Sequence, residues 1–128
     1  MNKCDFRGKS HEEIAIFTKA CDVFALPVYT HNKEGTEPWR LVINEALSDS
    51  RPVVVIDAVG CSEDLVINGY NGYVVKEKDI DGLKNAKRDI LINNEKLFHF
   101  KSNAYNVIEE YTYENMAKDM INSINDIL

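Results

Sequence analysis

The stretch Arg51-Pro52-Val53-Val54-Val55-Ile56 predicts the fold class of this chain. An unbroken run of β-branched residues, with no polar residue among them, is typical of a strand that is buried on both faces. Such strands occur almost only in parallel sheets that helices cover on both sides. We therefore expect residues 52–56 to lie inside an α/β domain.

The segments on either side of this strand alternate between strand and helix. Further short strands are expected at residues 4–7, 23–26 and 73–75, and the turn signal Asn71-Gly72 precedes the last of them. Because helical segments separate the strands, the sheet is expected to be parallel, with helices on both faces.

Local capping signals and periodic apolar residues locate the helices. Ser10 and Glu13 have the spacing of a capping box, and Asp79 is expected to cap a later helix. A short helix should begin after Gly60 and end near Gly69. Two amphipathic helices are expected at about residues 95–110 and 113–128. The apolar stripe of the last one comprises Met116, Met120, Ile124 and Leu128.

The composition narrows the functional class. The 128 residues suffice for one domain with a core, and 45% of them are hydrophobic. A net charge of −6 argues against a nucleic acid partner and against an anionic membrane surface. The three cysteines, Cys4, Cys21 and Cys61, are widely spaced, which favours a reducing compartment, structural roles and no metal site.

A second stretch, Glu37-Pro38-Trp39-Arg40-Leu41-Val42-Ile43-Asn44-Glu45-Ala46, indicates a ligand. Proline is tolerated in the first turn of a helix, so Glu37 is expected at the start of a helix that runs to about residue 47. The free N–H groups at that start suit a phosphate. Glu45, two turns further on, could accept hydrogen bonds from paired sugar hydroxyls. The pattern therefore predicts a nucleotide or nucleotide-sugar site.

The two glutamates and five sequence blocks, in order, resemble the donor-binding C-terminal domain of retaining glycosyltransferases of family 4, group 1, which have the GT-B fold. The blocks are Phe6-Arg7-Gly8 with Glu12-Glu13-Ile14, Ala20 through Pro27, Arg51 through Val55, Asp57-Ala58-Val59-Gly60 with Glu63-Asp64-Leu65-Val66, and Asn71 through Val75. The resemblance covers nearly the whole chain. It implies a Rossmann-like parallel sheet, and residues 1–128 would be a partial, nucleotide-sugar-binding C-terminal domain.

The resemblance also assigns roles to residues. Glu37 would face the donor sugar and serve the reaction as the catalytic residue; otherwise it simply favours a helix N-terminus. Glu45, expected to be half-buried, would bind the ribose hydroxyls; otherwise it is a rim glutamate that reaches water. Backbone amides near Trp39, Leu41 and Val42 would hold the sugar and diphosphate, while the side chains of Leu41 and Val42 serve the core.

Two positions depart from the family pattern, and one loop is a weaker match. Arg40 stands where the family usually has glycine, and it could add a charge to the phosphates, point away or partly block the site. Ser50 also replaces a usual glycine, which suggests a change of turn. The loop at Gly8, Lys9 and Ser10 corresponds to a region that commonly meets the nucleobase, although helix capping is the better explanation for Ser10.

By the same resemblance, two strand-helix units would precede Cys4 and supply central strands of the usual order 3-2-1-4-5-6. We therefore expect an incomplete C-terminal half of a GT-B enzyme that lacks the N-terminal acceptor domain and is inactive alone. Its exposed sheet edge would drive self-association.

The expected function is transfer of a sugar from a UDP- or GDP-sugar, with retention, in polysaccharide or glycoconjugate biosynthesis. No cofactor or metal is expected. The location would be cytoplasmic, with the whole enzyme free or peripheral at the inner face of the membrane. The alternative is a non-catalytic half-domain that pairs with a separate acceptor-binding chain. A dehydrogenase-like module ranks lower because the GxGxxG fingerprint is missing from the sequence.

Overall fold

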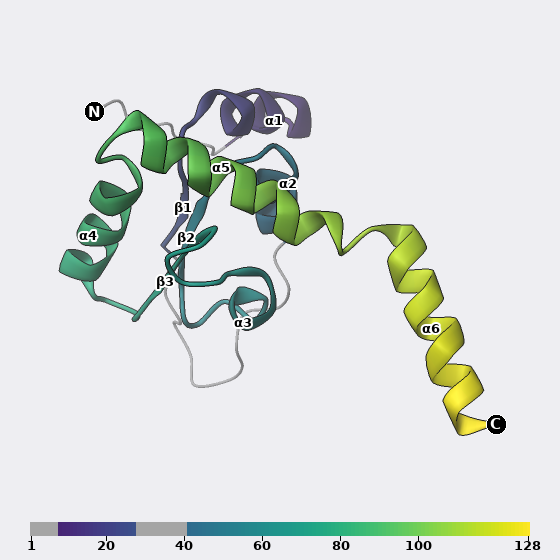
Figure 1. Ribbon diagram of the computed structural model, residues 1–128. Helices are drawn as coiled ribbons and strands as arrows, with labels where there is room; N and C mark the ends of the chain where they lie inside the picture. The colour runs from purple at the N-terminus through teal and green to yellow at the C-terminus, as the bar shows by residue number, and fades with distance from the viewer. Residues whose placement is uncertain (1–7, 28–40) are drawn as a thin grey trace.

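A parallel sheet organises the computed structural model of the protein, which describes residues 8–27 and 41–128 (Figure 1). Within those residues the strands are β1 (Phe24–Leu26), β2 (Val53–Ile56) and β3 (Gly72–Val75), in the order β1-β2-β3. Val53 lies opposite both Phe24 and Gly72 in the register. The expected α/β class with a parallel sheet is confirmed. The strand expected at residues 4–7 lies outside the described residues.

Strand β2 is buried along its whole length, as its run of valines predicts. Val53 and Val55 belong to a core cluster that includes residues of α2 (Leu41–Ser48), whereas Val54 belongs to a second cluster that includes residues of α4 (Ile80–Ile90). Successive side chains of a strand point to opposite faces, so the two clusters lie on opposite sides of the sheet. Helices therefore cover both faces.

Strand β3 approaches β2 so closely that its first residue must be glycine. A Cβ atom on Gly72 would lie 2.0 Å from the carbonyl oxygen of Val53. The preceding Asn71 is fully buried. Its Oδ1 accepts a hydrogen bond from the Ile67 N–H, and its Nδ2 donates one to the Leu65 carbonyl, both at 2.8 Å. The Asn71-Gly72 turn signal thus marks a closely packed connection.

The capping signals of α1 (His11–Ala20) and α4 are confirmed. The Ser10 Oγ accepts from the Glu13 N–H at 3.2 Å, and the Glu13 Oε2 accepts from the Ser10 N–H at 2.8 Å. Asp79 accepts from the Gly82 N–H at 2.8 Å at the start of α4. Each polar side chain satisfies a backbone N–H that lacks a partner inside its helix.

The short helix α3 (Ser62–Leu65) ends earlier than expected. The last hydrogen bond of the helix is the one that the Val66 N–H donates to the Ser62 carbonyl at 3.1 Å. The next N–H, that of Ile67, donates to the Asn71 side chain instead. The expectation of a helix that ends near Gly69 was therefore wrong, because Asn71 captures the donor that a further turn would need.

Helix α5 (Asn94–Glu109) lies across the amino ends of the strands (Figure 1). Its Lys101 Nζ contacts Asp22, just before β1, at 2.7 Å. Its Asn103 Nδ2 donates to the Tyr70 carbonyl, just before β3, at 2.9 Å. Phe100 joins one core cluster, while Ala104 and Ile108 join the other. With the amino edge covered by α5, a ligand would approach the sheet from its carboxyl edge.

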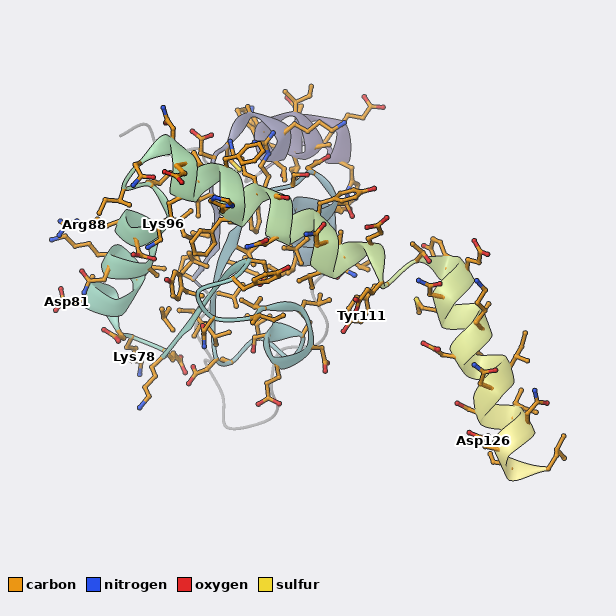
Figure 2. The ribbon with its side chains drawn as sticks, viewed as in Figure 1. Lys78, Asp81, Arg88, Lys96, Tyr111 and Asp126 are labelled. Carbon is orange, nitrogen blue, oxygen red and sulfur yellow. The ribbon has the colours of Figure 1, made fainter. Side chains whose placement is uncertain are left out.

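A three-residue network ties β3, α4 and α5 together. The Tyr73 hydroxyl donates to Asp89, and the Lys96 ammonium donates to the other oxygen of Asp89, each at 2.5 Å. The Lys96 hydrogen bond, followed by that of Tyr73, lowers the pKa of Asp89. Burial, reinforced by the bond to Asp89, raises the pKa of Tyr73 to about 12. Figure 2 shows Lys96 at the side of α5 that faces α4.

The final helix α6 (Tyr113–Ile127) extends away from the sheet and the other helices (Figure 1). None of its residues is buried. Its expected apolar stripe exists but is exposed, from 51% at Met116 to 98% at Leu128. Periodicity therefore identified the helix correctly, but this stripe has no covering partner among the described residues.

The two described cysteines have structural positions, as predicted. Cys61 is fully buried in the core at the start of α3. Cys21 is half-buried at the end of α1, where its thiol donates to the Thr18 carbonyl at 3.1 Å. Burial raises the pKa of the Cys21 thiol, which keeps it in the unreactive protonated form. Cys4 lies outside the described residues.

Candidate functional site

The described part of the candidate site is built on helix α2. Ile43, Ala46 and Leu47 are fully buried on one side of this helix. The positions at helical spacing on the opposite side, Leu41 and Glu45, are exposed. The residues Glu37, Trp39 and Arg40, predicted to bind the donor, lie outside the described residues, so their roles stay predictions.

Two expectations about the side chains of α2 were wrong. Leu41 was expected to serve the core, but 69% of it is exposed. Glu45 was expected to be half-buried, but it is exposed, and its carboxylate has no hydrogen bond or ion pair among the described residues. Val42, by contrast, packs against the core cluster as expected. The helix is rotated so that its Leu41–Glu45 face remains open to a ligand.

The loop at Gly8, Lys9 and Ser10 is exposed. Gly8 has a φ of +74°, a conformation that favours glycine. Lys9 lies 3.8 Å from Glu13 and 5.9 Å from the centre of the Phe17 ring. The Ser10 side chain caps α1, as its alternative interpretation predicted. Contact of this loop with a nucleobase stays a prediction.

A groove joins the open face of α2 to α1 and to the corner between α5 and α6. It is open on one side, and its volume is about 1420 Å³. Its lining from α1 and α2 includes His11, Thr18, Leu41, Glu45 and Ser48, followed by Asp49. We call this cavity the α1–α2 groove. It brings Leu41 and Glu45 together with the first residue of α1, one position after the predicted nucleobase loop.

The far wall of the α1–α2 groove comes from the corner between α5 and α6. Tyr111, Asn115 and Asp119 contribute to it. The Tyr111 hydroxyl donates to the Asp64 carbonyl at 3.1 Å, which ties the corner to α3. Figure 2 shows Tyr111 at the junction of the two helices.

Sequence reasoning missed this wall, and it gave no role to His11, Thr18 or Asp49. A helical projection of residues 11–18 would have placed His11 and Thr18 on one face. The approach of residues 111–119 is a tertiary contact, for which the sequence carried no local signal.

Some kinds of site have no support in the described ranges. Across residues 8–27 and 41–128, no group of three or more His, Cys, Asp and Glu side chains is placed to hold a metal ion. Within the same residues, no helix combines the length and the apolar composition that crossing a membrane requires.

Curated relatives of this chain are glycosyltransferases. A glycosyltransferase of Methanocaldococcus jannaschii is 33% identical over 89 residues, which is 70% of this chain and 23% of that protein. The poly(ribitol-phosphate) alpha-N-acetylglucosaminyltransferase of Staphylococcus aureus is 29% identical over 108 residues, which is 84% of this chain and 21% of the relative. The chain thus spans less than a quarter of the length of these relatives.

Solved structures agree with the fold. Sucrose-phosphate synthase from Thermosynechococcus elongatus superposes with a TM-score of 0.72 at 25% identity, over 99% of this chain and 29% of that one. Anabaena HepE in complex with UDP superposes with a TM-score of 0.69 at 26% identity, over 88% of this chain and 29% of that one. The same Anabaena protein is also known in complex with UDP-glucose.

A family model supplies the assignment. The model for glycosyl transferases group 1 matches residues 1–107, which include the described strands β1, β2 and β3 and the residues of α1 through most of α5. The parallel sheet, the order of the sequence blocks and this match agree with one another, and the chain belongs to the group 1 glycosyltransferase family.

Proposed function

We propose that this chain is the C-terminal, donor-binding part of a retaining family 4 glycosyltransferase, and that it binds a nucleoside diphosphate sugar. The observation that carries the proposal is the α1–α2 groove, which holds Glu45 and Leu41 together with the start of α1. In open parallel α/β sheets, ligands bind outside the carboxyl ends of the strands. Helix α2 follows β1, so the start of α2, which lines the groove with Leu41, lies toward the carboxyl end of that strand.

In this arrangement Glu45 would bind the ribose. It is exposed and lines the groove, and its carboxylate has no polar partner among the described residues. A carboxylate accepts hydrogen bonds and donates none, so the adjacent 2′- and 3′-hydroxyls of a ribose are matched ligands. The start of α2 would favour the diphosphate through the positive end of the helix. Glu37 would then face the sugar, and the backbone near Trp39 and Arg40 would approach the phosphates.

What the relatives bind, and what they are named for, supports the kind of donor and the kind of product that we propose. The Anabaena protein that superposes on this chain was crystallised with UDP and with UDP-glucose. The Staphylococcus relative is named for transfer to a poly(ribitol-phosphate) chain. We therefore propose a UDP- or GDP-sugar as donor, and a role in polysaccharide or glycoconjugate biosynthesis for the whole enzyme.

A chemical-shift titration of the 128-residue chain with UDP, GDP, ADP and NAD tests the proposal. One nucleoside diphosphate should shift the amides of residues 41–48 and of 8–14. Glu45→Gln should weaken this binding about tenfold, because one carboxylate loses its charge-assisted hydrogen bonds.

Glu63→Gln is the matched control for that titration. Glu63 is an exposed helical glutamate outside the groove lining, so its variant should bind like the wild type. Equal binding by the wild type and Glu45→Gln would contradict the role of Glu45. An absence of shifts with all four nucleotides would contradict donor binding by this chain.

A second candidate is a non-catalytic half-domain that pairs with a separate acceptor-binding chain. The exposed apolar stripe of α6 favours it, because solvent-exposed apolar surface of that extent is typical of interaction sites. Either reading predicts no sugar transfer by this chain alone, since catalysis needs groups held together in one closed cleft. Measurable transfer by the isolated chain would contradict both.

A further inference from the structure

The basic side chains are unevenly distributed along a chain whose net charge is −6. Residues 76–88, which comprise the connection after β3 and most of α4, carry five basic side chains and three acidic ones. The five basic residues are Lys76, Lys78, Lys84, Lys87 and Arg88. None of them forms an ion pair with another described residue. We propose that the outer side of α4 binds the surface of a membrane that contains anionic lipids.

Helical spacing and the packing of α4 on the sheet define this binding surface. Ala86 and Ile90 are buried in the core cluster that includes Val54 of β2. A different side of the helix carries positions that are three or four residues apart. We call these residues the α4 face: Ile80, Lys84, Lys87, Arg88 and Leu91. All of them are exposed except Lys87, which is partly buried, and Figure 2 shows Arg88 on the side of α4 that faces away from the sheet.

The charge of the α4 face complements an anionic surface. The acidic residues of α4 are Asp81 and Asp89. Asp89 already accepts hydrogen bonds from Tyr73 and Lys96, so the exposed Asp81 is the carboxylate of this helix that can oppose the cations. The α4 face thus combines three cations with one nearby carboxylate. Anionic lipids attract each Lys or Arg that lies close to the membrane surface.

Exposed apolar side chains at both ends of the α4 face favour a membrane over a dissolved polyanion. At the first residue of α4, 73% of Ile80 is exposed, and beyond its last residue 47% of Leu91 and 64% of Ile92 are exposed. Apolar side chains beside basic ones can enter the headgroup layer while the cations stay at the lipid phosphates. A dissolved polyanion offers no apolar phase to these side chains.

The α4 face and the α1–α2 groove belong to different faces of the sheet. Helix α4 packs on the core cluster that contains Val54, whereas α2 packs on the cluster that contains Val53 and Val55. Figure 1 also shows α4 and α6 at opposite sides of the molecule. A membrane on the α4 face would therefore leave the groove open to water. The inference goes beyond the proposed function and does not depend on donor binding.

Vesicle flotation of the 128-residue chain tests the proposal. The chain should bind vesicles in which about one-third of the phosphatidylcholine is replaced by phosphatidylglycerol, and should bind vesicles of phosphatidylcholine alone much more weakly. Raising NaCl from about 0.1 M to about 0.5 M should release it, because salt screens the attraction. Lys84→Gln/Arg88→Gln should bind at least about tenfold more weakly, since each cation contributes roughly fivefold.

Two further variants control for charge. Lys19→Gln/Lys118→Gln removes the same amount of charge from exposed positions of α1 and α6, so it should bind vesicles like the wild type. Asp81→Asn removes the exposed carboxylate of α4 and should bind about fivefold more tightly. UDP should bind equally to the wild type and to Lys84→Gln/Arg88→Gln, which separates this proposal from donor binding.

A variant of the apolar side chains separates a membrane from a dissolved polyanion. Ile80→Ser/Ile92→Ser keeps every charge and should bind anionic vesicles at least about tenfold more weakly, because it removes the groups that enter the lipid. Unchanged vesicle binding by this variant, together with competition by soluble poly(glycerol phosphate), would assign a dissolved polyanion instead. The proposal would also be overturned if the wild type did not bind anionic vesicles, or if Lys84→Gln/Arg88→Gln bound them as tightly as Lys19→Gln/Lys118→Gln.

Discussion

At the scale of single residues, Ser50 shows how the chain accommodates a serine at a position where the resemblance led us to expect glycine. Its φ of +57° lies in the left-handed region, which favours glycine. The Ser50 N–H donates to the Leu47 carbonyl, and the Arg51 N–H donates to the Ala46 carbonyl. These two bonds make the glycine-type termination at the end of α2. Serine therefore adopts the backbone that glycine would prefer.

We predict that Ser50→Gly stabilises the protein by about 1 kcal/mol, because it removes the left-handed strain of a residue with a Cβ atom. Urea denaturation measures the change. Ser48→Gly is the control, since Ser48 is helical and glycine there should cost about 0.5 kcal/mol. A destabilised Ser50→Gly variant would show that the serine side chain has a favourable role that outweighs the strain.

The raised pKa of Tyr73 predicts that the folded protein loses stability at alkaline pH. Burial, together with the hydrogen bond to Asp89, raises its pKa to about 12 in the folded state, against about 10 in an unfolded chain. A raised pKa gives stability that is fully present below pH 10 and lost as pH rises from about 10 through about 12. The free energy of unfolding should therefore fall across this interval.

Tyr73→Phe provides the comparison for that prediction. It removes the ionisable hydroxyl while keeping the ring that packs 5.9 Å from Phe100. Urea denaturation at several pH values should show a smaller alkaline loss in this variant than in the wild type. Equal losses would mean that other groups cause the alkaline destabilisation.

At the scale of secondary structure, short-range sequence signals predicted where the helices begin. They were less successful in predicting how those helices pack against neighbouring elements. Ser10 and Asp79 were assigned correctly because a cap depends on residues within one turn of the chain. The early end of α3 was missed because its cause, Asn71, lies six residues beyond its last residue. The exposure of Glu45 was missed because the elements that pack against α2 decide how many residues beside its apolar stripe become buried.

Helix α6 gives a prediction at this scale. Since none of its residues is buried, deletion of residues 113–128 should change the free energy of unfolding by less than about 1 kcal/mol. Ile108→Ala, at the buried end of α5, should cost about 2–4 kcal/mol. Urea denaturation compares the two variants. A deletion as costly as Ile108→Ala would show that α6 packs against the domain in solution.

At the scale of the whole molecule, the buried valine run and the alternation of elements were enough to predict a parallel α/β fold. The sheet order, the two core clusters and the family assignment agree with that prediction. The α1–α2 groove could not be predicted in the same way. Its walls come from residues 11–19, 41–49 and 108–119, and only the packing of the chain brings these three segments together.

The position of α5 has a consequence for how the chain acquires its fold during synthesis. This helix contacts Asp22 and the Tyr70 carbonyl, and its Phe100, Ala104 and Ile108 belong to the cores on both faces of the sheet. A nascent chain that has not yet released residues 94–109 from the ribosome would leave both cores open to water. We therefore infer that the sheet becomes stable only after α5 has been synthesised, and that a ribosome stalled before this helix would present a chain that chaperones and proteases recognise as unfinished.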